Sequence, residues 1–278
     1  MLITGATRGL GRATARAAGR RGAEVLVTGR DPEAVARVAA EVGGQGHVLD
    51  LADPAAVRAA VPELGAVDVV AANAGLQIRG GPTTTVDGVE ETLAVNVLGH
   101  VALVDALLAG PRPPSRVAFL GSTTHDPATP TGTPAPVESP DLGALARGEL
   151  TTSGPQRYAT TKLHCTALAG AYAREHPEVH WSCFDPGLMP GTGLARTYGP
   201  VARLLWATVL RGVAVLPFAS TPARSGDALA RVLLDDPAPG ASGAVVDWRL
   251  RPGVVSARAA DPAFGDAVLA AARGLVAV

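Results

Sequence analysis

Residues 4–11 read Thr-Gly-Ala-Thr-Arg-Gly-Leu-Gly and lie between an apolar run at 2–4 and an Ala-rich stretch at 10–21. The first flank has the character of a strand and the second the pattern of a helix. Glycines let the backbone approach a phosphate, and a helix N-terminus supplies free N–H groups and partial positive charge. This placement predicts a dinucleotide-phosphate cradle. The residues expected to line it are Gly5, Thr7, Arg8, Gly9, Leu10 and Gly11.

The same alternation of apolar runs and helical patterns continues along the chain. The predicted strands are 2–4, 24–28, 46–50, 67–72, 116–121, 179–183 and 244–248. The predicted helices are 10–21, 32–42, 54–61, 86–109, 156–175, 222–234 and 262–275. Each of these apolar runs lacks strict polar alternation, which is expected of parallel strands buried on both faces. The sequence therefore predicts one α/β domain over residues 1–278, a doubly wound parallel sheet of about seven strands flanked by helices.

Composition excludes several classes of protein. Hydrophobic residues make up 47% and charged residues 18%, which fits a packed protein. A formal charge of -1 provides no basic field for nucleic acid. The apolar stretch at 204–218 is interrupted by Arg211 and is shorter than the ~20 residues of a spanning helix, so we expect no transmembrane segment.

The cysteines, histidines and N-terminus bear on compartment and metal binding. Two cysteines, Cys165 and Cys183, are too few for a disulfide framework, and no leader pattern opens the chain, which favours a reducing cytoplasm. The histidines lack metal-ligand spacing, so no metal is expected. Because Met1 stands almost directly on the first strand, a true start further upstream stays open.

Two long segments interrupt the alternation. Residues 123–156 are rich in Pro, Thr and Gly without an apolar period, and we expect an inserted loop there. Residues 188–219 follow the sixth strand and contain the apolar 204–218 stretch, which core packing or a lid over an apolar substrate explains equally well. We expect a substrate-lid region at 188–219.

The end of the second strand indicates the cofactor. Arg30 stands where dinucleotide-binding sheets place either an acid for a ribose hydroxyl or an arginine for a 2′-phosphate. With Arg8 it favours NADP(H). Asp31 is the competing feature, since it is either a ribose ligand or the N-cap before Pro32. The N-cap interpretation is favoured, and Asp53 before Pro54 repeats the pattern.

Tyr158 and Lys162 form the candidate catalytic pair. Their i, i+4 spacing in the 156–175 helix puts both side chains on one face. A nearby ammonium favours phenolate, so we expect Lys162 to lower the pKa of Tyr158. The chain holds 23 arginines and a single lysine, Lys162. An exposed helix charge in such a chain would be arginine, which favours a role that only a compact ammonium fills.

Five motifs in this order make the chain resemble the short-chain dehydrogenase/reductase family over nearly its whole length. They are TGATRGLG at 4–11, Asp50-Leu51, Asn73-Ala74-Gly75, Ser122 with Tyr158 and Lys162, and Asp185-Pro186-Gly187. The resemblance implies a Rossmann-type fold, a nicotinamide cofactor and an acid/base tyrosine. The catalytic residues that it implies are Asn96, Ser122, Tyr158 and Lys162.

The resemblance also assigns roles. Asp50 would contact adenine, Asn96 would hold a water in a proton relay, and Ser122 would orient the substrate carbonyl. Tyr158 would transfer the proton, while Lys162 would bind the nicotinamide ribose. Further cofactor contacts are implied at Arg30, Leu51, Asn73, Ala74, Gly75, Pro186, Gly187, Leu188 and Thr192. Ser122 lies 36 residues before Tyr158, farther than usual in the family, and Thr123 is its competitor.

The stretches GSTTHDPATPTG (121–132) and PGLMPGTGLAR (186–196) resemble the protochlorophyllide-reductase and retinol-dehydrogenase-like branch of the family. The resemblance implies a bulky, largely apolar carbonyl or alcohol substrate and a homodimer or homotetramer, unless the 123–156 loop covers the faces used for assembly. Reduction of an activated C=C bond is the alternative reaction, and a non-catalytic NADPH-binding regulatory protein is the alternative from another class. A hydrolase is disfavoured because Ser122, His125 and Asp126 are too close along one loop to form a triad.

Overall fold

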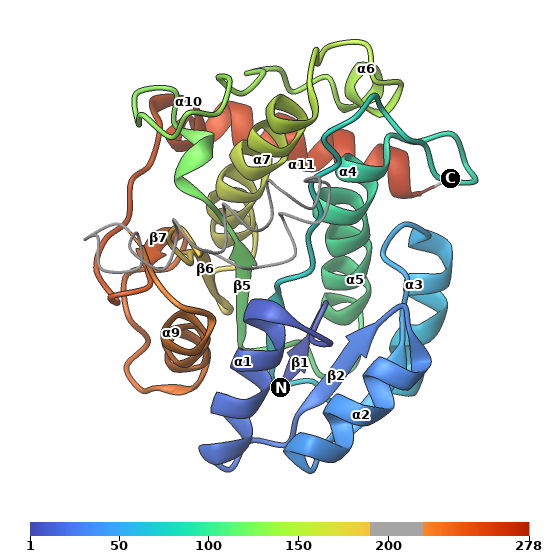
Figure 1. Ribbon diagram of the computed structural model, residues 1–278, viewed down its shortest axis with the longest axis vertical. Helices are drawn as coiled ribbons and strands as arrows, with labels where there is room; N and C mark the ends of the chain where they lie inside the picture. The colour runs from blue at the N-terminus through green and yellow to red at the C-terminus, as the bar shows by residue number, and fades with distance from the viewer. Residues whose placement is uncertain (190–218, 278) are drawn as a thin grey trace, which may run out of the picture.

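The computed structural model describes residues 1–189 and 219–277, and at its centre is a sheet of seven strands in the order β3-β2-β1-β4-β5-β6-β7 (Figure 1). All of these strands run parallel. Their bounds are β1 Leu2–Ile3, β2 Leu26–Gly29, β3 Gln45–Val48, β4 Val69–Ala72, β5 Arg116–Leu120, β6 His180–Asp185 and β7 Ala244–Asp247. The predicted doubly wound parallel sheet is confirmed.

Burial of the strands follows their position in the sheet. β1, β2 and β4 are buried throughout, as aliphatic strands covered on both faces should be. β3 is different, because it forms an edge of the sheet and is largely exposed, with Val48 57% accessible. The expectation that every strand is buried on both faces is therefore wrong for β3, since an edge strand has a neighbour on one side only.

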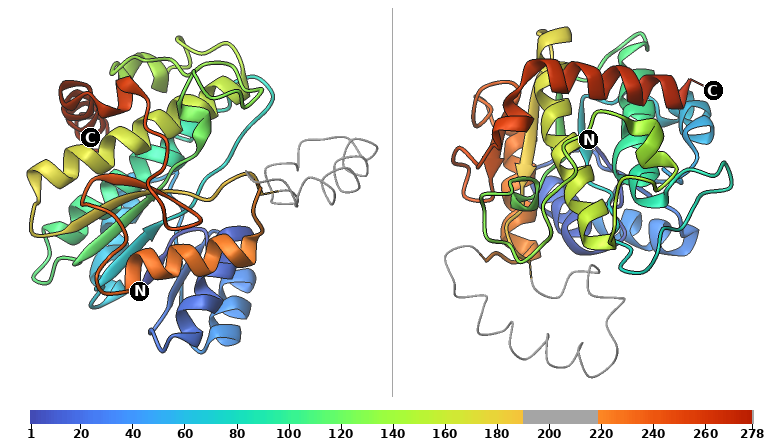
Figure 2. Two further views of the ribbon diagram at one scale, coloured as in Figure 1. Left: turned by 90° about the vertical axis from the view of Figure 1, so that its left-hand side faces the viewer. Right: turned by 90° about the horizontal axis from the view of Figure 1, so that it is seen from above.

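Helices cover both faces of the sheet (Figure 2). One face carries α1 Gly9–Arg20, α2 Pro32–Val42 and α9 Pro222–Leu234, with α1 packed against α9. The other face carries α3 Pro54–Ala60, α5 Gly99–Leu108 and α7 Gly154–Glu175. There α11 Pro262–Val276 packs on α7 and α5. Shorter elements are η1 Val61–Leu64, α4 Glu91–Leu93, η2 Ala94–Leu98, η3 Thr123–His125, α6 Leu142–Ala146 and α10 Ala257–Ala260.

The N-termini of α2 and α3 are fixed by acidic caps. The Asp31 carboxylate accepts hydrogen bonds from the backbone N–H groups of Glu33 and Ala34, at 3.0 and 3.2 Å. Asp53 accepts one from Ala56 N at 2.9 Å. Such caps satisfy N–H groups that have no partner within the helix. The N-cap interpretation of Asp31 is thus confirmed.

Two predicted elements need correction. Residues 123–156 are not one loop, because they contain η3, α6 and the first residues of α7. The caps Asp141 and Ser153, which accept from Ala144 N and Gln156 N, start α6 and α7 without a long apolar period to reveal them. The helix predicted at 86–109 begins at Glu91, because residues 84–90 turn back in an antiparallel bridge between Thr84 and Glu90.

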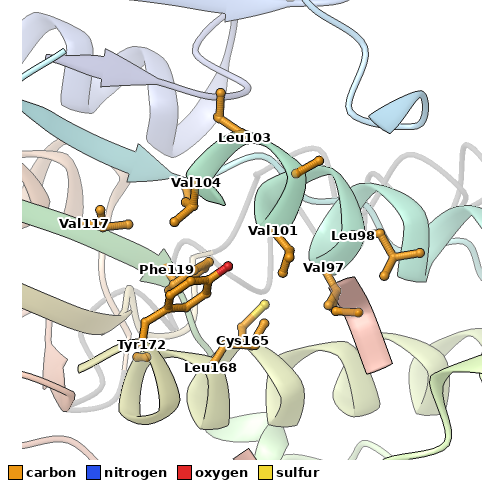
Figure 3. Packing of buried hydrophobic residues seen from close by; sticks show 14 of the residues in the cluster. Val97, Leu98, Val101, Leu103, Val104, Val117, Phe119, Cys165, Leu168 and Tyr172 are labelled. Carbon is orange, nitrogen blue, oxygen red and sulfur yellow. The ribbon is translucent and has the colours of Figure 1, made fainter. Parts of the chain in front are cut away.

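The larger apolar core lies between the sheet and the α5/α7 pair (Figure 3). Val97 and Val101 point toward α7, where Cys165 lies opposite Val97 and Tyr172 reaches toward Val101, with Phe119 of β5 beside Tyr172. The Phe119 and Tyr172 rings stack with centroids 5.8 Å apart, and Tyr172 and Trp181 stack at 4.6 Å. This packed layer supports the helix that carries Tyr158 and Lys162.

Residues 91–108, spanning α4 to α5, are long and apolar enough to cross a membrane by length and composition alone. Since 78% of this stretch is buried inside the fold, it packs as a core helix. Most of the expected lid region, including Thr192 and the apolar stretch at 204–218, lies outside the described residues.

Candidate cofactor and catalytic site

The site begins where the strand order reverses, between β1 and β4, the place at which open α/β sheets bind their ligands. Thr4 follows β1, and its hydroxyl accepts hydrogen bonds from the backbone N–H groups of Asn73 and Ala74, both at 2.9 Å. The Asn73 side chain donates in return to Thr4 O at 2.8 Å. A Cβ at Gly5 would lie 2.9 Å from Ala74 Cα, so only glycine allows this approach. The glycine loop and residues 73–75 form one unit.

The glycine loop has the geometry of a phosphate cradle. Gly5 and Gly9 have φ of 63° and 53°, in the left-handed region that favours glycine. A Cβ at Gly11 would lie 2.5 Å from Gly5 O, so α1 begins close against the loop. The N-cap of α1, Arg8, makes no side-chain capping bond, which leaves the first-turn N–H groups for an anion. These residues fit the pyrophosphate of a dinucleotide.

The next two strand ends lie beside this cradle. Arg30 follows β2, and its side chain is 56% accessible and 3.7 Å from the Glu91 carboxylate. Thr7 packs against the same strand end, since a Cβ at Gly29 would lie 2.7 Å from Thr7 Cγ2. Beyond β3, the Asp50 carboxylate is exposed and accepts from Ala52 N at 3.0 Å. Leu51 is buried, and its carbonyl lies against Gly99 of α5.

Tyr158 and Lys162 lie together on α7, as their spacing predicts. Lys162 Nζ is 5.4 Å from the centroid of the Tyr158 ring, and it donates to Leu120 O at the end of β5, at 2.7 Å. The Lys162 side chain is buried, which is unusual for a lysine. Ser122 follows β5, and its hydroxyl lies near enough to Tyr158 to act on the pKa of that residue, in the lowering direction. The predicted catalytic groups are therefore brought together.

The pKa of Tyr158 departs from the sequence-based expectation. Burial raises this pKa above its usual value of 10.0, and the Lys162 charge and the Ser122 hydroxyl, which act in the opposite direction, are outweighed. Lys162 lowers this pKa, as its spacing predicts, but the expected net shift below the usual value is wrong because burial outweighs the lysine charge. The reason is desolvation of the phenolate, which spacing along the sequence cannot reveal.

Asn96 lies in η2, a π-helical turn in which Gly99 N donates to Ala94 O. The Asn96 amide accepts from Leu76 N at 2.9 Å and donates to Leu76 O and to Thr161 Oγ1, at 3.1 and 3.0 Å. Thr161 in turn donates to Tyr158 O at 2.8 Å. A Cβ at Gly75 would meet both Asn96 Oδ1 and Lys162 Nζ, at 3.5 and 3.7 Å. Asn96 thus joins the 73–76 segment to the helix of Tyr158.

The turn after β6 is held by its own hydrogen bonds and by the start of α9. The Asp185 carboxylate accepts from Gly187 N at 3.0 Å, and Gly187 has φ of 71°. Ser225 at the start of α9 donates to Pro186 O at 2.7 Å. Leu188 pairs with Ala219 in an isolated parallel bridge and is exposed.

Three residues of this framework were missed by the sequence analysis. Arg157 and Glu90 form a buried ion pair at 3.2 Å, which ties the 78–90 segment to α7 directly before Tyr158. His100 is buried between Asn96 and Thr4. The sequence feature that could have pointed to His100 is its i+4 position after Asn96 in a helix. Arg157 and Glu90 are distant in sequence, so no local pattern predicts their pairing.

Comparisons with known proteins agree with the observed architecture. The family model described as short chain dehydrogenase matches residues 1–126. A Streptomyces lividans protein named "Probable oxidoreductase" is 31% identical, with 95% of this chain and 93% of that protein covered. Protochlorophyllide reductase B of Hordeum vulgare is 32% identical, with 74% of this chain and 60% of that protein covered.

A solved structure of a Mycobacterium paratuberculosis protein superposes with a TM-score of 0.73 at 26% identity, covering all of this chain and 92% of the other. Three observations indicate the same family. They are the Streptomyces lividans relative aligned over nearly its full length, the family model over residues 1–126, and the seven-stranded parallel sheet. The chain belongs to the short-chain dehydrogenase family of oxidoreductases.

Proposed function

We propose that this protein is an NADP(H)-dependent oxidoreductase that moves hydride between the nicotinamide and a carbonyl or alcohol carbon of a bulky, largely apolar substrate. The observation that carries the proposal is the convergence of Ser122, Tyr158 and buried Lys162 beside the glycine loop and the 73–75 segment. The apolar stretch at 204–218, together with exposed Leu188, supports an apolar substrate.

In this proposal the first turn of α1 and the glycine loop hold the cofactor pyrophosphate, and Arg30 holds a 2′-phosphate. The bound nicotinamide supplies or takes up the hydride. Ser122 Oγ accepts from Thr124 N and Thr124 Oγ1, at 3.3 and 3.0 Å, so its one proton is left for donation, toward Tyr158 in the protein alone and to a substrate oxygen once substrate binds. Tyr158 donates the proton that the developing alkoxide needs, and Lys162 stabilises the phenolate that is left.

The raised pKa of Tyr158 predicts how the free protein titrates. A phenol whose pKa lies above 10.0 is protonated at neutral pH, which is the form that donates a proton to a carbonyl. Absorbance of tyrosinate in wild-type protein minus that in Tyr158→Phe should therefore rise with a midpoint above about pH 10. A difference curve with a midpoint well below pH 10 would contradict the conclusion that burial outweighs the Lys162 charge in setting the Tyr158 pKa.

Selectivity between the cofactors tests the NADP(H) assignment. Arg30→Ala should weaken NADPH binding by about 10- to 100-fold, because a charge-assisted phosphate contact is lost, and should change NADH binding by about twofold at most. The measurement is the dissociation constant of each reduced cofactor, followed by its fluorescence. Arg37→Ala on α2, which removes another exposed arginine, is the matched control and should change neither value. A wild-type preference for NADH would overturn the assignment.

A further inference from the structure

A buried histidine links the part of the site around the glycine loop to the part around Tyr158. His100 in α5 is 1% exposed, and its two ring nitrogens contact different segments. Nδ1 lies 3.1 Å from Asn96 O, and Nε2 lies 2.9 Å from Thr4 Oγ1. No motif that was read from the sequence includes this residue.

The hydrogen-bonding partners of His100 determine which ring nitrogen carries the proton. A backbone carbonyl only accepts hydrogen bonds, so Nδ1 must carry the proton that points at Asn96 O. The Thr4 hydroxyl already accepts from Asn73 N and Ala74 N, which occupies both of its lone pairs. Its own proton is therefore donated, and unprotonated Nε2 at 2.9 Å is nearer than the other acceptor, Ala71 O at 3.3 Å.

Burial maintains this neutral form. Desolvation lowers the pKa of His100 to about 4, and the Lys162 charge acts in the same direction, although the bond to Asn96 O opposes it. At neutral pH the ring therefore has one donor and one acceptor, and both are used. A second proton on Nε2 would face a hydroxyl that has no lone pair to receive it.

Each end of the histidine bridge leads to one part of the site. Through Thr4 it reaches the backbone of Asn73 and Ala74, next to the glycine loop. Through Asn96 it reaches Thr161, which contacts the backbone carbonyl of Tyr158. We propose that His100 is a positioning residue, held as the Nδ1–H tautomer, that aligns the cofactor-supporting segment 73–75 with Asn96 beside the catalytic helix. This inference rests on the proposed function, because alignment matters only if both parts act together.

Two substitutions, each of which replaces the ring by an amide that overlies one of its two nitrogens, separate the two links. In His100→Asn the side-chain N–H group can still reach Asn96 O, but the acceptor for Thr4 is lost. In His100→Gln an acceptor can still reach Thr4, but the donor to Asn96 O is lost. We expect His100→Asn to weaken NADPH binding by about three- to tenfold with a smaller change in kcat, the effect of one buried hydrogen bond. We expect His100→Gln to show the reverse, with kcat lowered about three- to tenfold and NADPH binding nearly unchanged.

A second buried histidine provides the matched control. His164 on α7 is fully buried, and burial lowers its pKa to about 4, as for His100. Its Nε2 contacts Ser139 O at 3.1 Å instead of the site. His164→Asn and His164→Gln should therefore lower the thermal midpoint without separating the NADPH dissociation constant from kcat. Equal effects of both His100 substitutions on both quantities, or no effect, would reduce His100 to a core residue and overturn the proposal.

The tautomer can be measured without any turnover. ¹⁵N-histidine NMR at neutral pH should show His100 protonated at Nδ1 only, assigned by the loss of its signals in His100→Asn. Protonation at Nε2 would overturn the proposal even if the enzyme is active. If the wild-type protein binds no NADPH, the proposed function fails, whereas the NMR result still decides whether the Thr4–His100–Asn96 bridge exists.

Discussion

Tyr158→Phe should lower the rate of hydride transfer by about a thousandfold, the magnitude of a general acid/base group, while NADPH still binds. The substitution removes only the phenolic oxygen and keeps the ring that lies 5.4 Å from Lys162 Nζ. Cofactor affinity should stay within about threefold of wild type, because the glycine loop and Arg30 supply most of the binding. The measurements are single-turnover decay of NADPH absorbance and an NADPH dissociation constant for each protein.

The same helix offers a matched control for this substitution. Tyr172 lies on α7 in the core, and its hydroxyl donates to Asp105 at 2.9 Å. Tyr172→Phe removes the same atom and one hydrogen bond to a carboxylate, so it should cost about 1.5–3 kcal/mol of stability and leave hydride transfer unchanged. If Tyr158→Phe retains wild-type turnover, the proton comes from another group and the assignment of Tyr158 is wrong.

Lys162→Arg should reduce kcat/KM by about a hundredfold or more, although it preserves the positive charge. The ammonium is almost fully buried and donates to Leu120 O, in a space shaped for a compact group. A planar guanidinium is larger, and overpacking of this kind typically costs about 1–3 kcal/mol. Steady-state kinetics and a thermal melt on the same sample separate lost catalysis from lost stability.

A second substitution distinguishes charge from shape at this position. Lys162→Met has a similar length without the charge, and it should raise the pKa of Tyr158 further because the Lys162 charge lowers it. Both variants should show this large loss of kcat/KM if position and charge are both required. Full activity in Lys162→Arg would show that any cation suffices, and the solitary lysine would then need another explanation.

The fold could be predicted in outline because its signals are local. Aliphatic runs gave the strands, and proline after Asp31 and Asp53 gave two helix starts to the residue. The exposed edge at β3 and the short helix α6 were missed. The spacing of apolar residues along the sequence reveals neither which strand lies at the sheet edge nor where a cap starts a short helix. The late start of the helix at Glu91 depends on the bridge between Thr84 and Glu90, a contact outside the helix itself.

The sequence allowed the residues of the site to be predicted, but not all of their protonation behaviour and hydrogen bonding. The i, i+4 relation of Tyr158 and Lys162 follows from helix geometry, and the structure confirms their proximity. The sign of the Tyr158 pKa shift was not predictable, because desolvation depends on everything packed around the ring. The His100 bridge also escaped, since it requires the π-turn at Ala94–Leu98 and the approach of Thr4, 96 residues away.

Transfer of deuterium from NADPH labelled at both C4 positions tests the central claim most directly. The labelled cofactor is incubated with a panel of bulky aryl and alicyclic ketones and their α,β-unsaturated analogues, and products are analysed by mass spectrometry and NMR. The account predicts one deuterium on the carbinol carbon of the alcohol product, with transfer lost in Tyr158→Phe. Deuterium on the carbon β to an intact carbonyl would show C=C reduction instead. NADPH bound but never oxidised by any member of the panel would contradict the catalytic account.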